Sequence, residues 1–126
     1  MSSKYESIKI VNNAGQKNLF RDIRDLIIST DNGIIEIVHY GGNFVMLFDR
    51  LRYFEVGFST PQAPEPGFKV CNVKLAGLNR ENAQSISIND VINYEWKADQ
   101  GLLMLFGKNA TLGVHLDHLV SFSLEK

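Results

Sequence analysis

Apolar and polar residues alternate along most of this chain, a pattern that predicts half-buried β-strands. Ile8 and Ile10, for example, share one side of a predicted first strand. Asn32-Gly33 and residues 41–43 separate further alternating runs, and such glycine-containing segments are typical of hairpin turns. The predicted strands are 5–11, 24–30, 34–40, 44–48, 51–58, 68–75, 85–88, 91–97, 102–106, 111–116 and 119–124.

Residues 20–56 and 88–124 look like two copies of one structural unit. Without gaps, each residue of the first copy aligns with the residue 68 positions later in the chain. The alignment places Asp22 on Asp90, Gly33 on Gly101, Asp49 on Asp117 and Phe54 on Phe122. The repeat predicts that both halves have the same order of strands and turns.

Residues 16–30 allow two interpretations. Leu19, Ile23 and Leu26 belong to a stripe with helical spacing, whereas the aligned segment 88–99 alternates with period two. We therefore interpret 16–23 as a short helix or helical turn followed by a strand over 24–30. The alternative is an α+β fold in which a full helix over 16–29 packs on the sheet.

The predicted fold class is mainly β, with at most one short helix near 14–25. We expect an antiparallel sandwich or partly closed barrel, built from two pseudo-repeats of about five strands each. A single domain would span 1–126, with pseudo-repeats at about 5–58 and 68–124. All three prolines lie in the segment 59–67, which we interpret as the connection between the halves.

Composition narrows the functional classes only slightly. A net charge of −1 gives no overall attraction to nucleic acid or anionic membranes. The single cysteine, Cys71, cannot form an internal disulfide, and its alternating surroundings favour a buried strand position. We see neither an apolar signal-peptide segment nor an apolar run long enough to span a bilayer. These features lead us to expect a cytoplasmic protein without membrane partners.

No motif in the sequence points to catalysis, a metal or another cofactor. Asp22, Asp49, Asp90 and Asp117 recur at the corners of the repeat, where we expect them to be structural acids that accept backbone N–H bonds. His115-Leu116-Asp117-His118 superficially resembles a metal-binding run, but no second cluster completes a site. We therefore expect no catalytic residues and no metal.

Differences between the two copies are more informative than motifs. In the second copy, the inward-facing series of the predicted strands is wholly apolar, including Ile92, Tyr94, Trp96 and Val120. The first copy has Arg24 in place of Ile92 and Arg52 in place of Val120. A lone buried arginine is costly, so both side chains are expected to reach solvent or a partner. The candidate partner-binding residues are Arg21, Arg24, Arg50, Arg52, Tyr53, His39 and Tyr40. The alternative is a solvated rim with no binding role.

These features favour a non-catalytic protein-binding module over an enzyme. Small bacterial β domains of this kind include dedicated inhibitors and immunity proteins that cap one partner, such as a toxin. The arginines and aromatic residues also suit a nucleic-acid-binding β-barrel. A small enzyme or ligand-binding barrel is the third hypothesis. The sequence leaves the oligomeric state open.

Overall fold

The protein is built almost entirely from antiparallel strands, as the computed structural model of residues 4–62, 64–78 and 82–126 shows. Residues 1–3, 63 and 79–81 lie outside the described residues, and residue 63 belongs to the segment 59–67 that we interpret as the connection between the halves. The strands are β1 (Tyr5–Asn12), β2 (Lys17–Phe20), β3 (Ile23–Ser29), β4 (Ile34–His39), β5 (Gly42–Leu47), β6 (Leu51–Phe58), β7 (Phe68–Leu75), β8 (Gln84–Lys97), β9 (Leu102–Gly107), β10 (Ala110–His115) and β11 (Leu119–Glu125).

The mainly β prediction is confirmed, and the α+β alternative is wrong. In the described residues, the helical elements are the single 3-10 turns η1 (Phe48–Arg50), η2 (Ala98–Gln100) and η3 (Leu116–His118). None of them is long and apolar enough to cross a membrane.

The short helix expected over 16–23 is also wrong. Lys17–Phe20 forms β2, which pairs with β1 so that Ile8 lies opposite Phe20. The Asn12 carboxamide oxygen accepts hydrogen bonds from the N–H groups of Ala14 and Gln16, which closes the turn before β2. Helix propensity in this stretch is overridden because β1 offers a backbone partner and the turn is already capped by Asn12.

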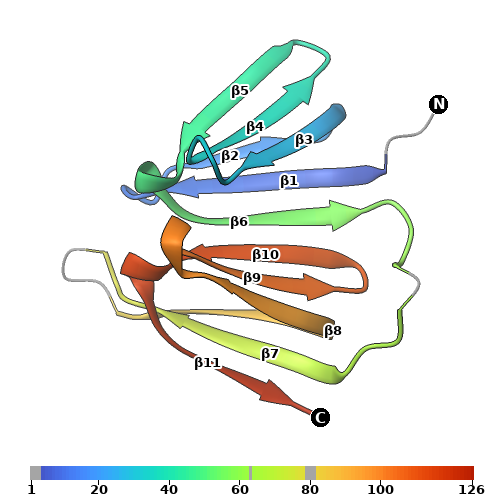
Figure 1. Ribbon diagram of the computed structural model, residues 1–126, viewed down its shortest axis with the longest axis vertical. Helices are drawn as coiled ribbons and strands as arrows, with labels where there is room; N and C mark the ends of the chain where they lie inside the picture. Colours follow the sequence, from blue (N-terminus) through green and yellow to red (C-terminus); the bar gives the residue numbers. More distant parts are fainter. Residues whose placement is uncertain (1–3, 63, 79–81) are drawn as a thin grey trace.

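The strands form two sheets (Figure 1). The larger sheet has eight strands in the order β11-β7-β8-β9-β10-β6-β1-β2, and β3-β4-β5 form the smaller one. The larger sheet is not closed into a barrel, so the arrangement is that of a β-sandwich. In Figure 1 the smaller sheet lies at one end of the long axis and β11 at the other.

Two hydrophobic cores lie on opposite faces of the central strands. Leu102 and Met104 of β9 belong to the first core, together with residues of β1, β3, β4 and β6. Leu103 and Leu105, which alternate with them, belong to the second core with residues of β7, β8 and β10. All four side chains are at most 3 % exposed. Burying each one contributes about 1.5–3 kcal/mol, so β9 supports both halves of the sandwich.

The sequence repeat corresponds to repeated backbone geometry. Elements β3, β4, β5 and η1 recur 68 residues later as the second part of β8, β9, β10 and η3. The backbone N–H of Tyr40 donates to the Asp22 carbonyl, and the N–H of Lys108 donates to the Asp90 carbonyl in the same way. A register shift also occurs at the same repeat position, between Ile23 and Asp25 in β3 and between Val91 and Asn93 in β8.

The corner aspartates are structural mainly through their backbone. The carbonyls of Asp22, Asp49 and Asp90 accept hydrogen bonds. Among the described residues, none of the four corner carboxylates accepts a backbone N–H, contrary to our expectation. The cap of η3 comes instead from His115, whose Nδ1 accepts from the Asp117 N–H.

The expected inward-facing series of the second copy is wrong at three positions. Tyr94, Trp96 and Val120 are 42 %, 51 % and 57 % exposed. Leu26 and Ile28, the first-copy counterparts of Tyr94 and Trp96, are half-buried because they pack against the first core. Arg52, the counterpart of Val120, is buried because β6 has a strand on each side, whereas β11 pairs only with β7 among the described strands.

Strands β6 and β10 join the two halves, with Gly113 opposite Phe54 in the register. A Cβ atom at Gly113 would overlap the Phe54 ring, which is fully buried over this glycine. The missing side chain therefore gives the Phe54 ring its place in the first core.

We predict that Gly113→Ala destabilises the protein by about 1–3 kcal/mol, because the Phe54 ring must move out of a packed core. Chemical denaturation followed by fluorescence measures the change in the free energy of unfolding. Ser123→Ala, at an exposed position of β11, is the control and should change it by less than about 0.5 kcal/mol. Equal stability of the two variants would show that Phe54 does not depend on Gly113.

Candidate binding surface and the buried arginine junction

The residues expected to form one binding patch lie in three different places. Arg21, Arg24 and Tyr40 are exposed and His39 is half-buried, and all four lie near the turn from β4 to β5. We call these four residues the Arg24–Tyr40 surface. The other three residues of the expected patch lie away from it.

Arg24 and Tyr40 contact each other directly. The guanidinium carbon of Arg24 lies 5.5 Å from the centre of the Tyr40 ring, within the range of a cation–π interaction. Tyr40 is 74 % exposed, the largest value among the exposed large apolar and aromatic side chains described. The pair therefore presents a cation and an aromatic ring to solvent at one point.

The backbone beneath this pair is held in place. The Tyr40 N–H donates to the Asp22 carbonyl at 3.2 Å, and the Gly41 N–H donates to His39 Nδ1 at 3.2 Å. The His39 ring also packs 5.2 Å from the Phe20 ring, which in turn contacts Phe44. The exposed pair thus rests on an ordered turn rather than on a long loop.

Arg50 is exposed but lies at the other end of the smaller sheet. His39 pairs with Gly42 at one end of the β4–β5 hairpin and Ile34 pairs with Leu47 at the other. The turn η1, which contains Arg50, directly follows Leu47. Arg50 therefore does not contribute to the Arg24–Tyr40 surface.

Arg52 and Tyr53 are buried, which corrects the expectation that they belong to an exposed patch. Each is only 2 % exposed, because β6 is covered on both edges by β1 and β10. The partner that the Arg52 side chain requires is supplied from within the chain. Its Nη2 donates to the Ala76 carbonyl at 2.8 Å and to Gln84 Oε1 at 3.3 Å.

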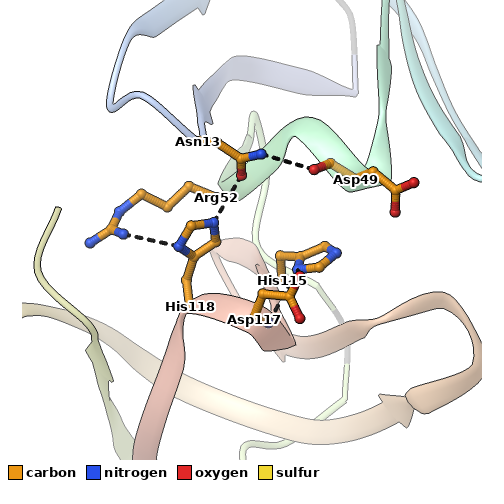
Figure 2. Close-up of polar contacts among 6 residues, drawn as sticks. All are labelled: Asn13, Asp49, Arg52, His115, Asp117 and His118. Carbon is orange, nitrogen blue, oxygen red and sulfur yellow. Dashed lines mark hydrogen bonds and ion pairs between the residues drawn. The ribbon is translucent and has the colours of Figure 1, made fainter. Parts of the chain in front are cut away.

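Arg52 also contacts His118 of η3, which extends the network to Asn13 and to Asp49 of η1 (Figure 2). Arg52 Nη1 lies 3.3 Å from His118 Nδ1, and His118 Nε2 lies 2.9 Å from the Asn13 side-chain oxygen. The Asn13 amide nitrogen then donates to the Asp49 carbonyl at 2.9 Å. We call Arg52, His118, Asn13, Gln84 and the Ala76 carbonyl the arginine junction.

The arginine junction requires a neutral His118. Arginine only donates, so Nδ1 of His118 must accept and its Nε2–H donates to Asn13. Burial lowers the pKa of His118, and the nearby Arg52 and His115 lower it further, against an opposing effect of Asp117. Proton uptake at His118 would place a positive charge against the buried guanidinium.

A cleft of about 340 Å³ lies beside the arginine junction. It is lined by Val11, Gly15, Lys17, Arg52, Tyr53, Leu78, Asn82, Ala83 and Gln84. Two cationic side chains, Lys17 and Arg52, therefore line one cleft. Sequence reasoning missed Lys17 and Gln84, because both lie outside the gap-free aligned segments and carry no motif.

The metal-ligating residue types and the cysteine are the remaining candidates for a site among the described residues. Among them, no group of three His, Cys, Asp or Glu residues could hold a metal ion. Cys71 is fully buried, and burial raises its thiol pKa to about 11, which disfavours the reactive thiolate.

Comparisons of the chain with protein-family models, with curated proteins and with solved structures gave no match. We therefore infer the function from the geometry of the chain's own residues.

We predict that alanine substitution of Arg52 and of Arg24 changes the stability of the protein to different extents, although both arginines replace apolar residues of the second copy. Arg52→Ala removes the donors of the arginine junction and should lower the free energy of unfolding by about 2–4 kcal/mol. Arg24→Ala, at an exposed position, should change it by less than about 0.5 kcal/mol. Thermal and chemical denaturation measure both values, and equal stability of the two variants would contradict the structural role of Arg52.

We also predict that stability falls with acidification through His118. Its pKa is lowered on folding, so the unfolded chain binds more protons in the window below the ordinary histidine pKa of about 6.5. The contribution of His118 is therefore complete above that pH and is lost as pH falls toward the folded pKa.

Denaturant titrations between about pH 8 and pH 5 bracket this window and measure the slope of stability against pH. His118→Gln can still accept from Arg52 and donate to Asn13 but does not titrate, so its slope should be shallower than that of the native chain. Identical slopes would exclude His118 as the source.

Proposed function

We propose that this chain is a non-catalytic protein-binding module that caps one partner, in the manner of a dedicated inhibitor or an immunity-type protein. The binding site would be the Arg24–Tyr40 surface. The observation that carries the proposal is the contact of Arg24 with a Tyr40 ring that is 74 % exposed. Arginine and tyrosine are enriched among the residues that dominate binding energy at protein interfaces.

The chemistry of the surface favours an acidic partner. Among the described residues, neither Arg21 nor Arg24 forms an ion pair. A carboxylate on the partner would satisfy a guanidinium with two parallel hydrogen bonds, while Tyr40 supplies apolar contact area. An immunity-type role would make the partner a toxin that carries such a carboxylate beside an apolar contact.

The ordered turn supports binding without a large conformational change. The Tyr40 N–H donates to the Asp22 carbonyl and the Gly41 N–H donates to the His39 ring, and these two bonds hold the backbone that carries Tyr40. A preorganised surface loses less conformational entropy on association, so more of its contact energy contributes to affinity.

We predict that the double variant Arg24→Ala/Tyr40→Ala loses its partner while remaining folded. The tagged native chain is used to capture proteins from the native host, and captured proteins are identified by mass spectrometry. The affinity of the purified partner is then measured, and it should weaken at least about tenfold in the double variant, or about 1.4 kcal/mol.

Arg50→Ala is the matched control, because Arg50 is also an exposed arginine but lies at the other end of the smaller sheet. It should bind like the native chain. Retained binding by the double variant would refute the proposed site. Salt-dependent binding of oligonucleotides that requires Arg24 would instead favour the nucleic-acid hypothesis, and a small ligand bound beside Lys17 would favour the ligand-binding hypothesis.

A further inference from the structure

The exposed large apolar side chains of this protein are not scattered. Eight such residues are described, namely Leu19, Ile27, Tyr40, Val45, Leu47, Tyr94, Trp96 and Val120. Val45 and Leu47 lie on β5, and the last three lie on the second part of β8 and on β11. Five of the eight therefore lie at or near two of the four sheet edges, those of β5 and β11, while Leu19 and Ile27 lie singly on the edge strands β2 and β3.

The internal repeat relates these two edges to a contact that already exists inside the molecule. Strand β6 of the first half pairs with β10 of the second half. In the 68-residue repeat, the second-copy counterpart of β6 is β11, and the first-copy counterpart of β10 is β5. Among the described strands, β11 pairs only with β7 and β5 only with β4. The free edges of β5 and β11 are thus the repeat equivalents of the two strands that join the halves.

Exposure of matching residues supports this relation on the β11 side. Phe54 is fully buried, whereas its counterpart Phe122 is half-buried. Arg52 is 2 % exposed, whereas its counterpart Val120 is 57 % exposed. Phe122 also contacts the rings of Tyr94 and Trp96, at 5.7 Å and 5.6 Å between ring centres. The first-half counterparts of these three aromatic residues are Phe54, Leu26 and Ile28, which pack with Leu102 and Met104 of β9, and Phe54 also lies against Gly113 of β10. Among the described strands, the aromatic cluster has no such cover from a following repeat.

The β5 side shows the same difference. His115 on β10 is 6 % exposed, and its counterpart Leu47 is 53 % exposed. Gly113 is buried against Phe54, and its counterpart Val45 is 51 % exposed. Each free edge therefore presents apolar side chains at positions that the internal contact buries.

We propose that β5 of one copy of this chain pairs antiparallel with β11 of a second copy, in the register of the β10–β6 contact. Gly113 lies opposite Phe54 and Thr111 opposite Val56 in that register. The equivalent pairs between copies are Val45 with Phe122 and Asn43 with Leu124. A second copy is the occupant because one chain carries both halves of the contact.

Two substitutions make the contact between copies weaker than the internal one. Val45 replaces Gly113, so the Phe122 ring cannot lie over the strand as the Phe54 ring does. Glu36 replaces the buried Met104, although Asn43 donates to its Oε2 at 2.8 Å and keeps the carboxylate partnered. Association is consequently reversible and depends on protein concentration.

The position of the two edges determines the form of the assembly. Figure 1 shows β5 and β11 toward opposite ends of the long axis. Pairing β5 with β11 is head to tail, so each added copy leaves one free edge of each kind and further copies can add.

Sedimentation velocity of the native chain, from low micromolar to millimolar concentration, tests the proposal. We expect species larger than the monomer that increase with concentration. Val45→Lys/Leu47→Lys and Trp96→Lys/Val120→Lys should each remain monomeric. Leu19→Lys is the matched control, because Leu19 is 54 % exposed on β2, which lies at the opposite end of the larger sheet from β11 and does not pair with β5, and it should assemble like the native chain. Circular dichroism verifies that each variant is folded.

Mixing the two monomeric variants tests the head-to-tail geometry. The first variant keeps an intact β11 edge and the second keeps an intact β5 edge, so the mixture should form a dimer of one copy of each and nothing larger. A contact of β5 with β5 could not be restored in this way. The proposal is overturned if the native chain stays monomeric throughout, if Leu19→Lys abolishes assembly as well, or if the mixture remains monomeric.

Discussion

Strands β6 and β10 come from different halves of the chain, and their pairing unites the eight-stranded sheet on which both cores are built. The pairing places Leu102 and Met104 of the second half in the core of the first half. It also places Tyr53 of the first half in the core of the second. Neither core is complete without residues from the other half, so the two repeats are not independent folding units in this structure.

The same pairing explains why a buried arginine is tolerated. Strand β6 is interior to the sheet, so the Arg52 side chain leaves it into the space between the halves, away from bulk water. There it is surrounded by acceptors from the second half, namely the Ala76 carbonyl, Gln84 and His118. Among the described residues, no buried side-chain polar atom lacks a hydrogen-bond partner. The desolvation of the guanidinium is offset by these bonds, and the geometry of the junction depends on both halves being in place.

Much of the strand order could be predicted from the sequence, whereas the exposure of particular residues could not. Alternation and turn residues locate strands such as Ile34–His39 and Leu119–Glu125 within a residue or two. The repeat correctly favoured a strand over a helix at Ile23–Ser29, but it did not reach far enough to identify β2. A period-two pattern identifies the two faces of a strand, but it does not reveal whether a further strand covers it. For that reason Arg52 was expected at the surface and Val120 inside, and the structure has them the other way round.

Comparison of the copies nevertheless selected positions where the two halves differ physically. Arg24 is exposed at the register shift of β3, the edge strand of the smaller sheet, where its guanidinium contacts the Tyr40 ring. Arg52 is buried because its strand is interior. One sequence difference thus marks an exposed surface, which we propose as the binding site, and the other marks the contact between the halves. In a tandem repeat, each half occupies a different position in the assembly even when its local fold is the same. The edge that is satisfied in one copy is necessarily free at the end of the array unless something else covers it.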